Sequence, residues 1–215
     1  DIEEGTEVII SVPEQTSNTL IPDSKLPFGH LFAVGKSQAG EMCVYRLENK
    51  TVCFLGDSIT AGSGISSMDK IFWNLLAERE GCISYGHGVG ATRIASQKSY
   101  GMDNIVKAPN QDENNEYFVT RVPDMVEDAD AIVVFGGTND YGHGNADFGT
   151  PDAKTPATYC GALNYLMRGL IEKYPTSEIV FLTPIQREGG TNPNSRGYTL
   201  KMYSDAIKEA AARYA

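Results

Sequence analysis

Ser58 stands where an apolar run breaks into a polar turn, and this placement suits a residue that does covalent chemistry. The run Thr51–Leu55 is short, β-branched and aromatic, which is typical of a strand buried on both faces of a parallel sheet. Gly56 permits a tight turn, so we expect Ser58 just beyond the carboxyl end of that strand, where ligands bind in open α/β sheets. We therefore interpret Ser58 as a nucleophile.

Two later turns also follow apolar runs. The first, residues 86–90, has glycine at alternate positions, which permits a backbone that approaches a ligand closely and directs N–H groups at it. The second turn follows the run Ala131–Phe135 and contains Asn139. Because loops after parallel strands collect along one edge of a sheet, we expect Ser58, Gly90 and Asn139 to converge there.

Apolar strand patterns alternate with amphipathic helix patterns from residue 51 to the end. This alternation predicts a parallel sheet covered by helices on both faces. Residues 96–116 are polar and are expected to form a long surface excursion. The expected strands are residues 51–55, 82–85, 131–135 and 178–184; the expected helices are residues 68–80, 117–128 with an interruption at Pro123, 159–174 and 199–215.

Residues 1–50 differ from the rest, and we treat them as an arm, a linker or a small β extension before a domain of residues 51–215. Three prolines among Ser, Thr and Asn favour an extended arm in the first half of this region. Leu31–Val34 and Met42–Leu47 are two short apolar runs that could pair as a hairpin. The arm could clasp the main domain or contact another chain.

Composition restricts the partners. A net charge of -10 disfavours nucleic acid and anionic membrane surfaces, and an uncharged or weakly charged substrate is easier to accept. No apolar run approaches the roughly 20 residues of a membrane helix. The chain begins at Asp1 without a signal segment, which fits a cytoplasmic protein, a secreted mature form or a cut fragment and leaves the compartment open.

Four cysteines are too widely spaced for a zinc site, and no histidines cluster. We expect Cys53 and Cys82 to pack as small buried hydrophobes. The sequence therefore predicts no metal, no disulfide framework and no cofactor.

Three blocks of the chain resemble the GDSL (SGNH) hydrolase family of esterases and lipases. They are Gly56-Asp57-Ser58-Ile59-Thr60, the glycine of the second turn at Gly90, and Gly136-Gly137-Thr138-Asn139-Asp140, in the order and spacing of the family. The resemblance covers residues from about 50 to the end. It implies a flavodoxin-like, three-layer α/β/α fold and hydrolysis of an ester through an acyl-serine intermediate.

By the same resemblance, Ser58 is the nucleophile, and an oxyanion hole is formed by the backbone N–H groups of Ser58 and Gly90 and the side-chain amide of Asn139. Neutral donors of this kind stabilise the negative charge that acyl transfer develops on the carbonyl oxygen. The substrate class implied is a small acyl ester, such as an acetylated carbohydrate or a lipid. Acyl and alcohol specificity stay open.

The chain departs from the family at the general base, which belongs to an Asp-x-x-His block after a fifth strand. No such block occurs in residues 1–215, whose histidines are His30, His87 and His143. Either the sequence stops before the last strand and base, or another histidine substitutes, or the module is silent. His143 is the candidate substitute because it follows Asn139 by four residues. We expect little or no esterase activity from this polypeptide, because a serine without a base is a poor nucleophile.

Each singled-out residue also has a structural interpretation. Ser58 could cap the next helix, Gly90 could turn the chain, and Asn139 could be an ordinary turn former. We assign Asp57 to local hydrogen bonding and Trp73 to the core, and we leave Arg93 open between a surface charge and a substrate contact.

Two other function classes remain. One is a catalytically silent carbohydrate-binding or assembly module, and the other is a flavodoxin-like module that binds a phosphate or a flavin. An open sheet edge, where the fifth strand is missing, would invite homo-oligomer contacts or cover by the residue 1–50 arm.

Overall fold

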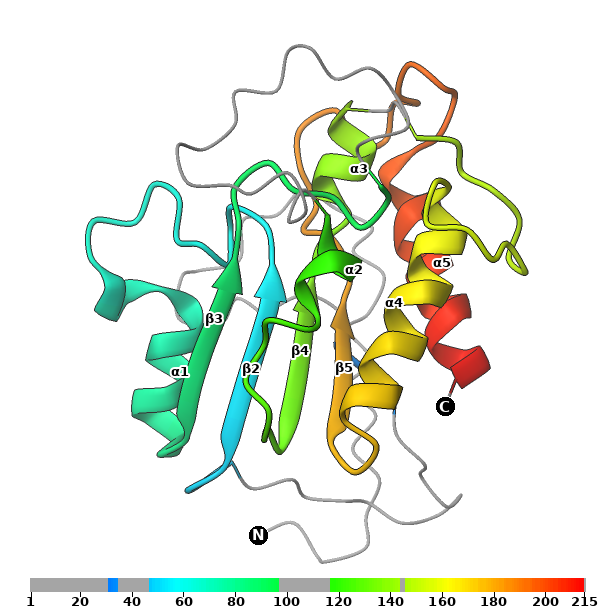
Figure 1. Cartoon of the computed structure of the whole chain (residues 1–215). Coiled ribbons are helices and arrows are strands. Elements are labelled where there is room, and N and C mark those ends of the chain that lie inside the picture. Colours follow the sequence, from blue (N-terminus) through cyan, green and yellow to red (C-terminus); the bar gives the residue numbers. More distant parts are fainter. Residues whose placement is uncertain (1–30, 35–46, 97–116, 144–145, 215) are drawn as a thin grey trace, which may run out of the picture.

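The computed structural model describes residues 31–34, 47–96, 117–143 and 146–214. They form a five-stranded sheet with the order β1-β5-β4-β2-β3 (Figure 1). Strands β5, β4, β2 and β3 run parallel to one another. Strand β1, at the edge next to β5, pairs antiparallel with it. The strands are β1 (Leu31–Val34), β2 (Thr51–Gly56), β3 (Ile83–Gly88), β4 (Ala131–Phe135) and β5 (Glu178–Leu182).

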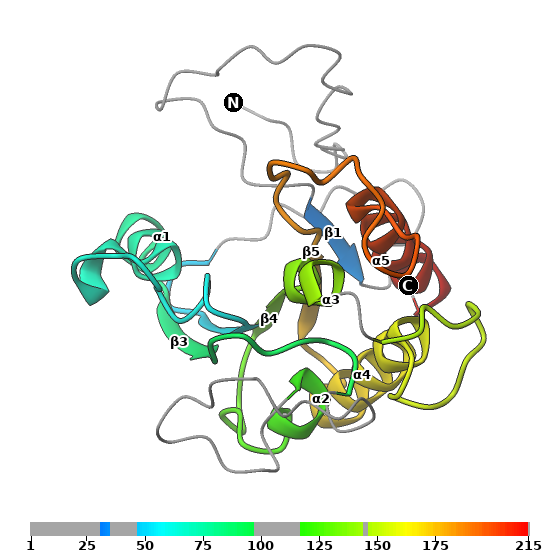
Figure 2. The ribbon, with the colours of Figure 1, turned by 90° about the horizontal axis from the view of Figure 1, so that it is seen from above.

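Helices cover both faces of the sheet, as the alternating sequence pattern predicted. Figure 2 shows α1 on one side and α2 and α4 on the other. The helices are η2, a 3-10 turn (Met68–Lys70), α1 (Phe72–Glu80), α2 (Phe118–Arg121), α3 (Thr138–His143), α4 (Tyr159–Lys173) and α5 (Leu200–Tyr214). This is the three-layer α/β/α arrangement that the family resemblance implied.

Alternate residues of the central strands enter two separate cores. Cys53 and Leu55 of β2 pack with α4 and α5 in the larger core, and Val52 and Phe54 pack with Trp73 of α1 in the smaller one. Side chains that alternate along a strand point to opposite faces, so a strand covered on both sides needs a continuous apolar run. This explains why Thr51–Gly56 contains no charged residue.

The turn expected after Ala131–Phe135, which was to contain Asn139, includes a helix. Gly136 and Gly137 form the turn, and α3 begins directly after it at Thr138. Gly137 has a φ of 103°, which favours glycine, and it reverses the chain between β4 and α3. Asn139 and His143 therefore belong to a helix and not to a loop.

The glycines of residues 86–90 also lie differently from the expectation. Gly86 and Gly88 are inside β3, which extends beyond the expected end at residue 85. A Cβ on Gly86 would lie 2.4 Å from the Trp73 ring, and a Cβ on Gly88 would lie 2.2 Å from the backbone nitrogen of Ala61. These two glycines serve close packing against α1 and against the turn that carries Ser58, so the turn interpretation was wrong for them.

Strand β1 comes from the region expected to be an arm. Its register with β5 pairs Leu31 with Leu182 and Val34 with Ile179. The arm therefore covers the β5 edge with one strand, as was proposed for an edge otherwise open. The suggested partner run, residues 42–47, lies outside the described residues except for Leu47. No helix of the described ranges has both the length and the apolar character that a membrane crossing requires.

Candidate active site

The carboxyl ends of β2, β3 and β4 are level with one another. Gly56 pairs with Gly88 on one side and with Phe135 on the other. Ser58 and Gly90 each follow this level by two residues, and Asn139 follows it by four. The register thus brings the three segments to one edge of the sheet, which is the upper edge in Figure 1.

The Ser58 turn folds back over the end of β2. The Ala61 N–H donates to the Asp57 carbonyl at 2.9 Å, and the Ser63 N–H donates to the Ser58 carbonyl at 2.9 Å. A Cβ on Gly56 would lie 1.8 Å from the Thr60 hydroxyl oxygen, so only glycine fits beneath the turn. The sharp reversal therefore depends on a glycine two residues before the serine.

Asp57 stabilises the Ser58 turn by a local hydrogen bond. Its carboxylate is buried and accepts the Ile59 N–H at 2.9 Å, which is the local role expected for it. Burial raises the pKa of Asp57, and the Ile59 N–H and the charge of Arg121 oppose that rise. Ser58 itself is half-buried. Within the described residues, neither its hydroxyl nor its N–H donates to a protein acceptor.

The segment from Val89 to Thr92 carries Gly90 past the Ser58 turn. The Val89 N–H donates to the Gly56 carbonyl at 3.1 Å, and the Thr92 hydroxyl donates to the Val89 carbonyl at 2.7 Å. A Cβ on Gly90 would contact nothing within 4 Å, so packing does not require glycine there. Ala91 has a φ of 61°, in the left-handed region, so the backbone beside Gly90 is held in an uncommon conformation.

Asn139 and Asp140 bind this same segment from α3. The Asn139 side-chain amide donates to the Thr92 carbonyl at 2.9 Å. The Asp140 carboxylate accepts the N–H groups of Ile94 and Ala95 at 3.0 and 2.9 Å. Burial raises the pKa of Asp140 to about 6, against the effect of those two N–H groups and of Arg93.

Arg121 is a functional candidate that the sequence did not reveal. Its guanidinium is buried and donates to the carbonyls of His87 and Gly56 at 2.6 and 3.0 Å and to the Thr92 hydroxyl at 3.1 Å. An arginine in a four-residue helix before a proline has no sequence signal of this kind. Only the folded contacts identify it.

The histidines considered as general bases lie in different parts of the chain. His143 ends α3 one turn after Asn139, on the same face of the helix, and its side chain is exposed. Partial desolvation, and then the charges of Arg93 and Arg187, lower its pKa. His87 lies within β3, where burial and Arg121 lower its pKa. His30 lies outside the described residues. In those residues no histidine hydrogen-bonds to Ser58.

Several residues were given a structural interpretation that their burial and contacts can test. Trp73 is buried and its ring N–H donates to the Thr60 carbonyl at 2.8 Å, as expected for a core residue. Arg93 is only 1% exposed, so it is not a surface charge. Ser58 does not cap α1, which begins at Phe72 after Ile71. Cys53 is buried and Cys82 half-buried, and Cys53, Cys82 and Cys160 are free thiols.

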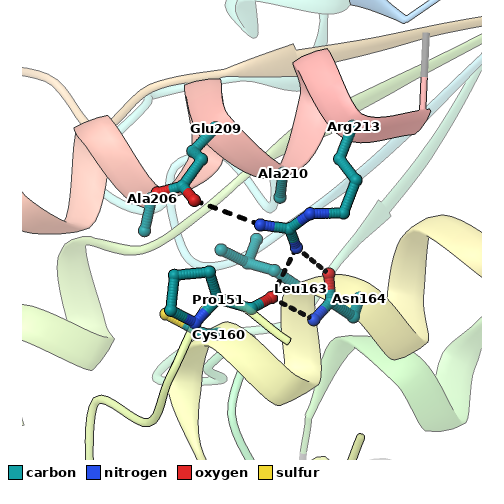
Figure 3. A pocket seen from close by; sticks show the side chains of 8 residues that line it. All are labelled: Pro151, Cys160, Leu163, Asn164, Ala206, Glu209, Ala210 and Arg213. Atoms are coloured by element: carbon teal, nitrogen blue, oxygen red, sulfur yellow. Dashed lines mark hydrogen bonds and ion pairs between the residues drawn. The ribbon is translucent and has the colours of Figure 1, made fainter. Parts of the chain in front are cut away.

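A hollow lies between α4 and α5, none of the candidate site residues lines it, and structural contacts fill it (Figure 3). The Arg213 guanidinium donates to the Asn164 side-chain oxygen at 3.0 Å and to Glu209 at 3.1 Å, and it also contacts the Pro151 carbonyl. We assign this hollow to helix packing. Its lining residues are Pro151, Cys160, Leu163, Asn164, Ala206, Glu209, Ala210 and Arg213.

No group of three His, Cys, Asp or Glu side chains in the described ranges is arranged to hold a metal ion. The polar groups at the sheet edge are a hydroxyl, an amide and backbone N–H groups. Such groups suit the binding of a carbonyl oxygen that gains negative charge.

In a comparison with protein families, residues 54–215 fit the model of the GDSL-like lipase/acylhydrolase family. No protein of curated function matches the chain.

Solved structures share the fold. A protein from Lactobacillus plantarum is 28% identical, with a TM-score of 0.60, and the match covers 78% of this chain and 74% of that one. A GDSL-like lipase from Bacteroides uniformis is 20% identical, with a TM-score of 0.55, over 77% of this chain and 80% of that one. A GDSL-like lipase from Bacteroides ovatus is 19% identical, with a TM-score of 0.56, over 78% of this chain and 82% of that one.

Proposed function

We propose that this chain, which belongs to the GDSL-like lipase/acylhydrolase family, is a serine ester hydrolase that acts on a small acyl ester through Ser58. The observation that carries the proposal is the level register of β2, β3 and β4. It delivers a half-buried serine, a glycine backbone segment and an asparagine amide to one sheet edge. These are the groups that acyl transfer requires in one place.

In the proposed reaction the Ser58 hydroxyl oxygen attacks the ester carbonyl carbon, and the carbonyl oxygen becomes an oxyanion. The N–H groups of Ser58 and Gly90 and the Asn139 amide donate to that oxyanion. The tetrahedral species collapses to an acyl-serine and releases the alcohol, and water then hydrolyses the acyl-serine. Each donor contributes roughly 2.7 to 4 kcal/mol to transition-state stabilisation in comparable sites.

The Ser58 proton needs an acceptor, because an unassisted hydroxyl attacks slowly at neutral pH. His143 has the lowered pKa of a neutral imidazole, which is the form that accepts a proton. Its neighbours are cationic, however, and no carboxylate among the described residues orients it as a triad acid would. We therefore expect residues 1–215 to accelerate ester hydrolysis by positioning and oxyanion stabilisation alone, roughly 10³ to 10⁴ over water.

For the substrate, we propose an uncharged acyl ester such as an acetylated glycan or a lipid. The net charge of -10 supports this choice, since anionic substrates are repelled at long range. Ile65 and Met68, which follow the Ser58 turn, are 47% and 62% exposed. They give the segment beside the nucleophile an apolar surface for an acyl chain or the face of a sugar ring.

The test is covalent capture of Ser58. A fluorophosphonate probe should form one adduct, and peptide mass spectrometry should place it on Ser58. Labelling confined to another serine would contradict the assignment. In that case, binding of glycans to the unmodified protein would support a silent binding module, and flavin absorbance of the purified protein would support the flavodoxin-like alternative.

A further inference from the structure

Arg121 lies beneath the candidate site and connects its parts. It is 4% exposed, and its two terminal nitrogens donate to three acceptors. Nη1 donates to the His87 carbonyl at 2.6 Å, and Nη2 donates to the Gly56 carbonyl at 3.0 Å. Nη2 also donates to the Thr92 hydroxyl at 3.1 Å. The carbonyls belong to the last residue of β2 and the next-to-last residue of β3, so one guanidinium joins the ends of two neighbouring strands.

Two of these three acceptors, the Gly56 carbonyl and the Thr92 hydroxyl, are coupled to proposed catalytic groups. The Gly56 carbonyl precedes Ser58 by two residues and also accepts the Val89 N–H. Thr92 follows Gly90 by two residues, and its hydroxyl donates in turn to the Val89 carbonyl at 2.7 Å. The Thr92 carbonyl accepts the Asn139 amide at 2.9 Å. Arg121 and Thr92 together therefore link the segments that carry the nucleophile and both other oxyanion donors.

Burial of this arginine is costly, which argues against a purely stabilising purpose. Burial lowers the pKa of Arg121 to about 10, although the nearby Asp57 acts in the opposite direction. Burial also raises the pKa of Asp57, although Arg121 opposes it. In both groups the loss of hydration outweighs their mutual attraction. Buried charges of this kind are weak sources of stability, and in some proteins they fix one geometry instead.

We propose that Arg121, acting through the Gly56 carbonyl and through Thr92, is the positioning residue that holds Ser58, Gly90 and Asn139 in the geometry for oxyanion binding. This inference rests on the proposed ester hydrolysis. Arg121 touches no substrate in this arrangement. Its effect is on the distance between the attacking oxygen and the donors, to which catalysis is sensitive: a shift of about 1 Å costs roughly 10²-fold in rate.

The planar fork of arginine is essential to the arrangement. Two nitrogens on one rigid group reach two carbonyls and a hydroxyl at once, whereas a lysine carries one nitrogen on a flexible stem. Arg121→Lys keeps the positive charge beside Asp57 but cannot bridge both strand ends. The substitution therefore separates positioning from simple charge compensation.

The experiment measures kcat and KM for 4-nitrophenyl acetate in Arg121→Lys and Thr92→Val, each corrected for its folded fraction by circular dichroism. We expect kcat to fall by roughly 10²-fold in Arg121→Lys and about tenfold in Thr92→Val, with KM changed less than about threefold, because only transition-state contacts are lost. Thr183→Val and Arg168→Lys are matched controls. Thr183 is a buried threonine after β5, and Arg168 is an exposed arginine on α4. Both should keep wild-type kcat.

Hydrogen exchange of the same variants gives a readout that does not depend on catalysis. Residues 56–61 and 87–92 should exchange faster in Arg121→Lys, while α4 should exchange as in wild type. If wild type turns over no ester but the exchange pattern changes as described, the proposed function fails and the positioning role stands. If Arg121→Lys keeps wild-type kcat, or loses activity only in proportion to unfolding of the whole protein including α4, the positioning role is overturned.

Discussion

The side-chain amide of Asn139 donates a hydrogen bond to the Thr92 carbonyl at 2.9 Å, which joins α3 to the segment that follows Gly90. A primary amide carries two N–H donors, so this bond uses one and fixes the plane of the other. An oxyanion donor that is oriented before the substrate arrives costs no reorganisation during the reaction. In the proposed oxyanion hole, this contact would orient the Asn139 amide before the substrate arrives.

Removal of the Asn139 amide should lower turnover and leave binding nearly unchanged. We expect Asn139→Ala to reduce kcat by roughly 10² to 10³-fold, since one oxyanion donor is lost. Initial rates with an aryl acetate measure this. Asn74→Ala is the control. Asn74 lies on α1, away from the proposed oxyanion hole, and its side-chain amide also donates to a backbone carbonyl, that of Met68. Equal rates for Asn139→Ala and Asn74→Ala would remove Asn139 from the oxyanion hole.

Two glycines near Ser58 should respond to alanine in opposite ways. Gly90→Ala keeps the N–H, and its Cβ has no neighbour within 4 Å, so turnover should change less than about fivefold. Gly88→Ala places its Cβ 2.2 Å from the Ala61 nitrogen, so the Ser58 turn must move. We expect a lower thermal midpoint and strongly reduced turnover for Gly88→Ala. The reverse order of effects would show that Gly90 is needed for space and not for its N–H.

His143 should contribute little to turnover. The side chain is exposed, and the charges that act on its pKa within the described residues are those of Arg93 and Arg187. We expect His143→Ala to change kcat for an aryl acetate less than about threefold, because a base that is not oriented adds little. His87→Ala, measured in parallel, tests the other described histidine. A loss of activity confined to His143→Ala would instead identify His143 as the general base.

Much of the fold could be predicted because its signals are local. The runs Thr51–Leu55 and Ala131–Phe135 are apolar throughout, and strands buried on both faces require this. The missed features depend on contacts between distant segments. Gly86 and Gly88 read as a turn, but they are strand residues that give room to Trp73 and to the Ser58 turn. Local composition cannot distinguish these two uses of glycine.

The candidate site likewise has residues that the sequence predicted and one residue that it did not. Ser58, Gly90 and Asn139 follow apolar runs, and the sheet register places their segments at one edge, as topology predicted. Arg121 gave no signal, because its acceptors are the carbonyls of His87 and Gly56, far away in the sequence. Every residue has a backbone carbonyl, so a sequence motif does not reveal which carbonyls Arg121 binds.

Protonation of Asp140 should change stability in a predictable direction. Burial raises its pKa from 3.8 to about 6, so the folded protein holds this proton more tightly than the unfolded chain does. The contribution of Asp140 to the free energy of unfolding therefore falls as the pH rises from about 4 to about 6, and it is constant above that.

Urea unfolding of wild type and Asp140→Asn at pH 4.5 and 7.5 measures this contribution. Asp140→Asn cannot ionise, so wild type should exceed the variant in free energy of unfolding by more at pH 4.5 than at pH 7.5. An excess that grows with pH would show that the Ile94 and Ala95 N–H groups stabilise the carboxylate more than burial disfavours it.

The most direct measurement of the central claim compares Ser58→Ala with Ser63→Ala in aryl acetate hydrolysis. Both serines lie in the same turn, where the Ser63 N–H donates to the Ser58 carbonyl, so the two variants perturb the turn similarly. In a catalytically complete form of the protein, which supplies a general base to Ser58, we predict that Ser58→Ala abolishes ester hydrolysis and that Ser63→Ala retains it, with both proteins folded. Turnover by Ser58→Ala at the wild-type rate would contradict the assignment of Ser58 as the nucleophile.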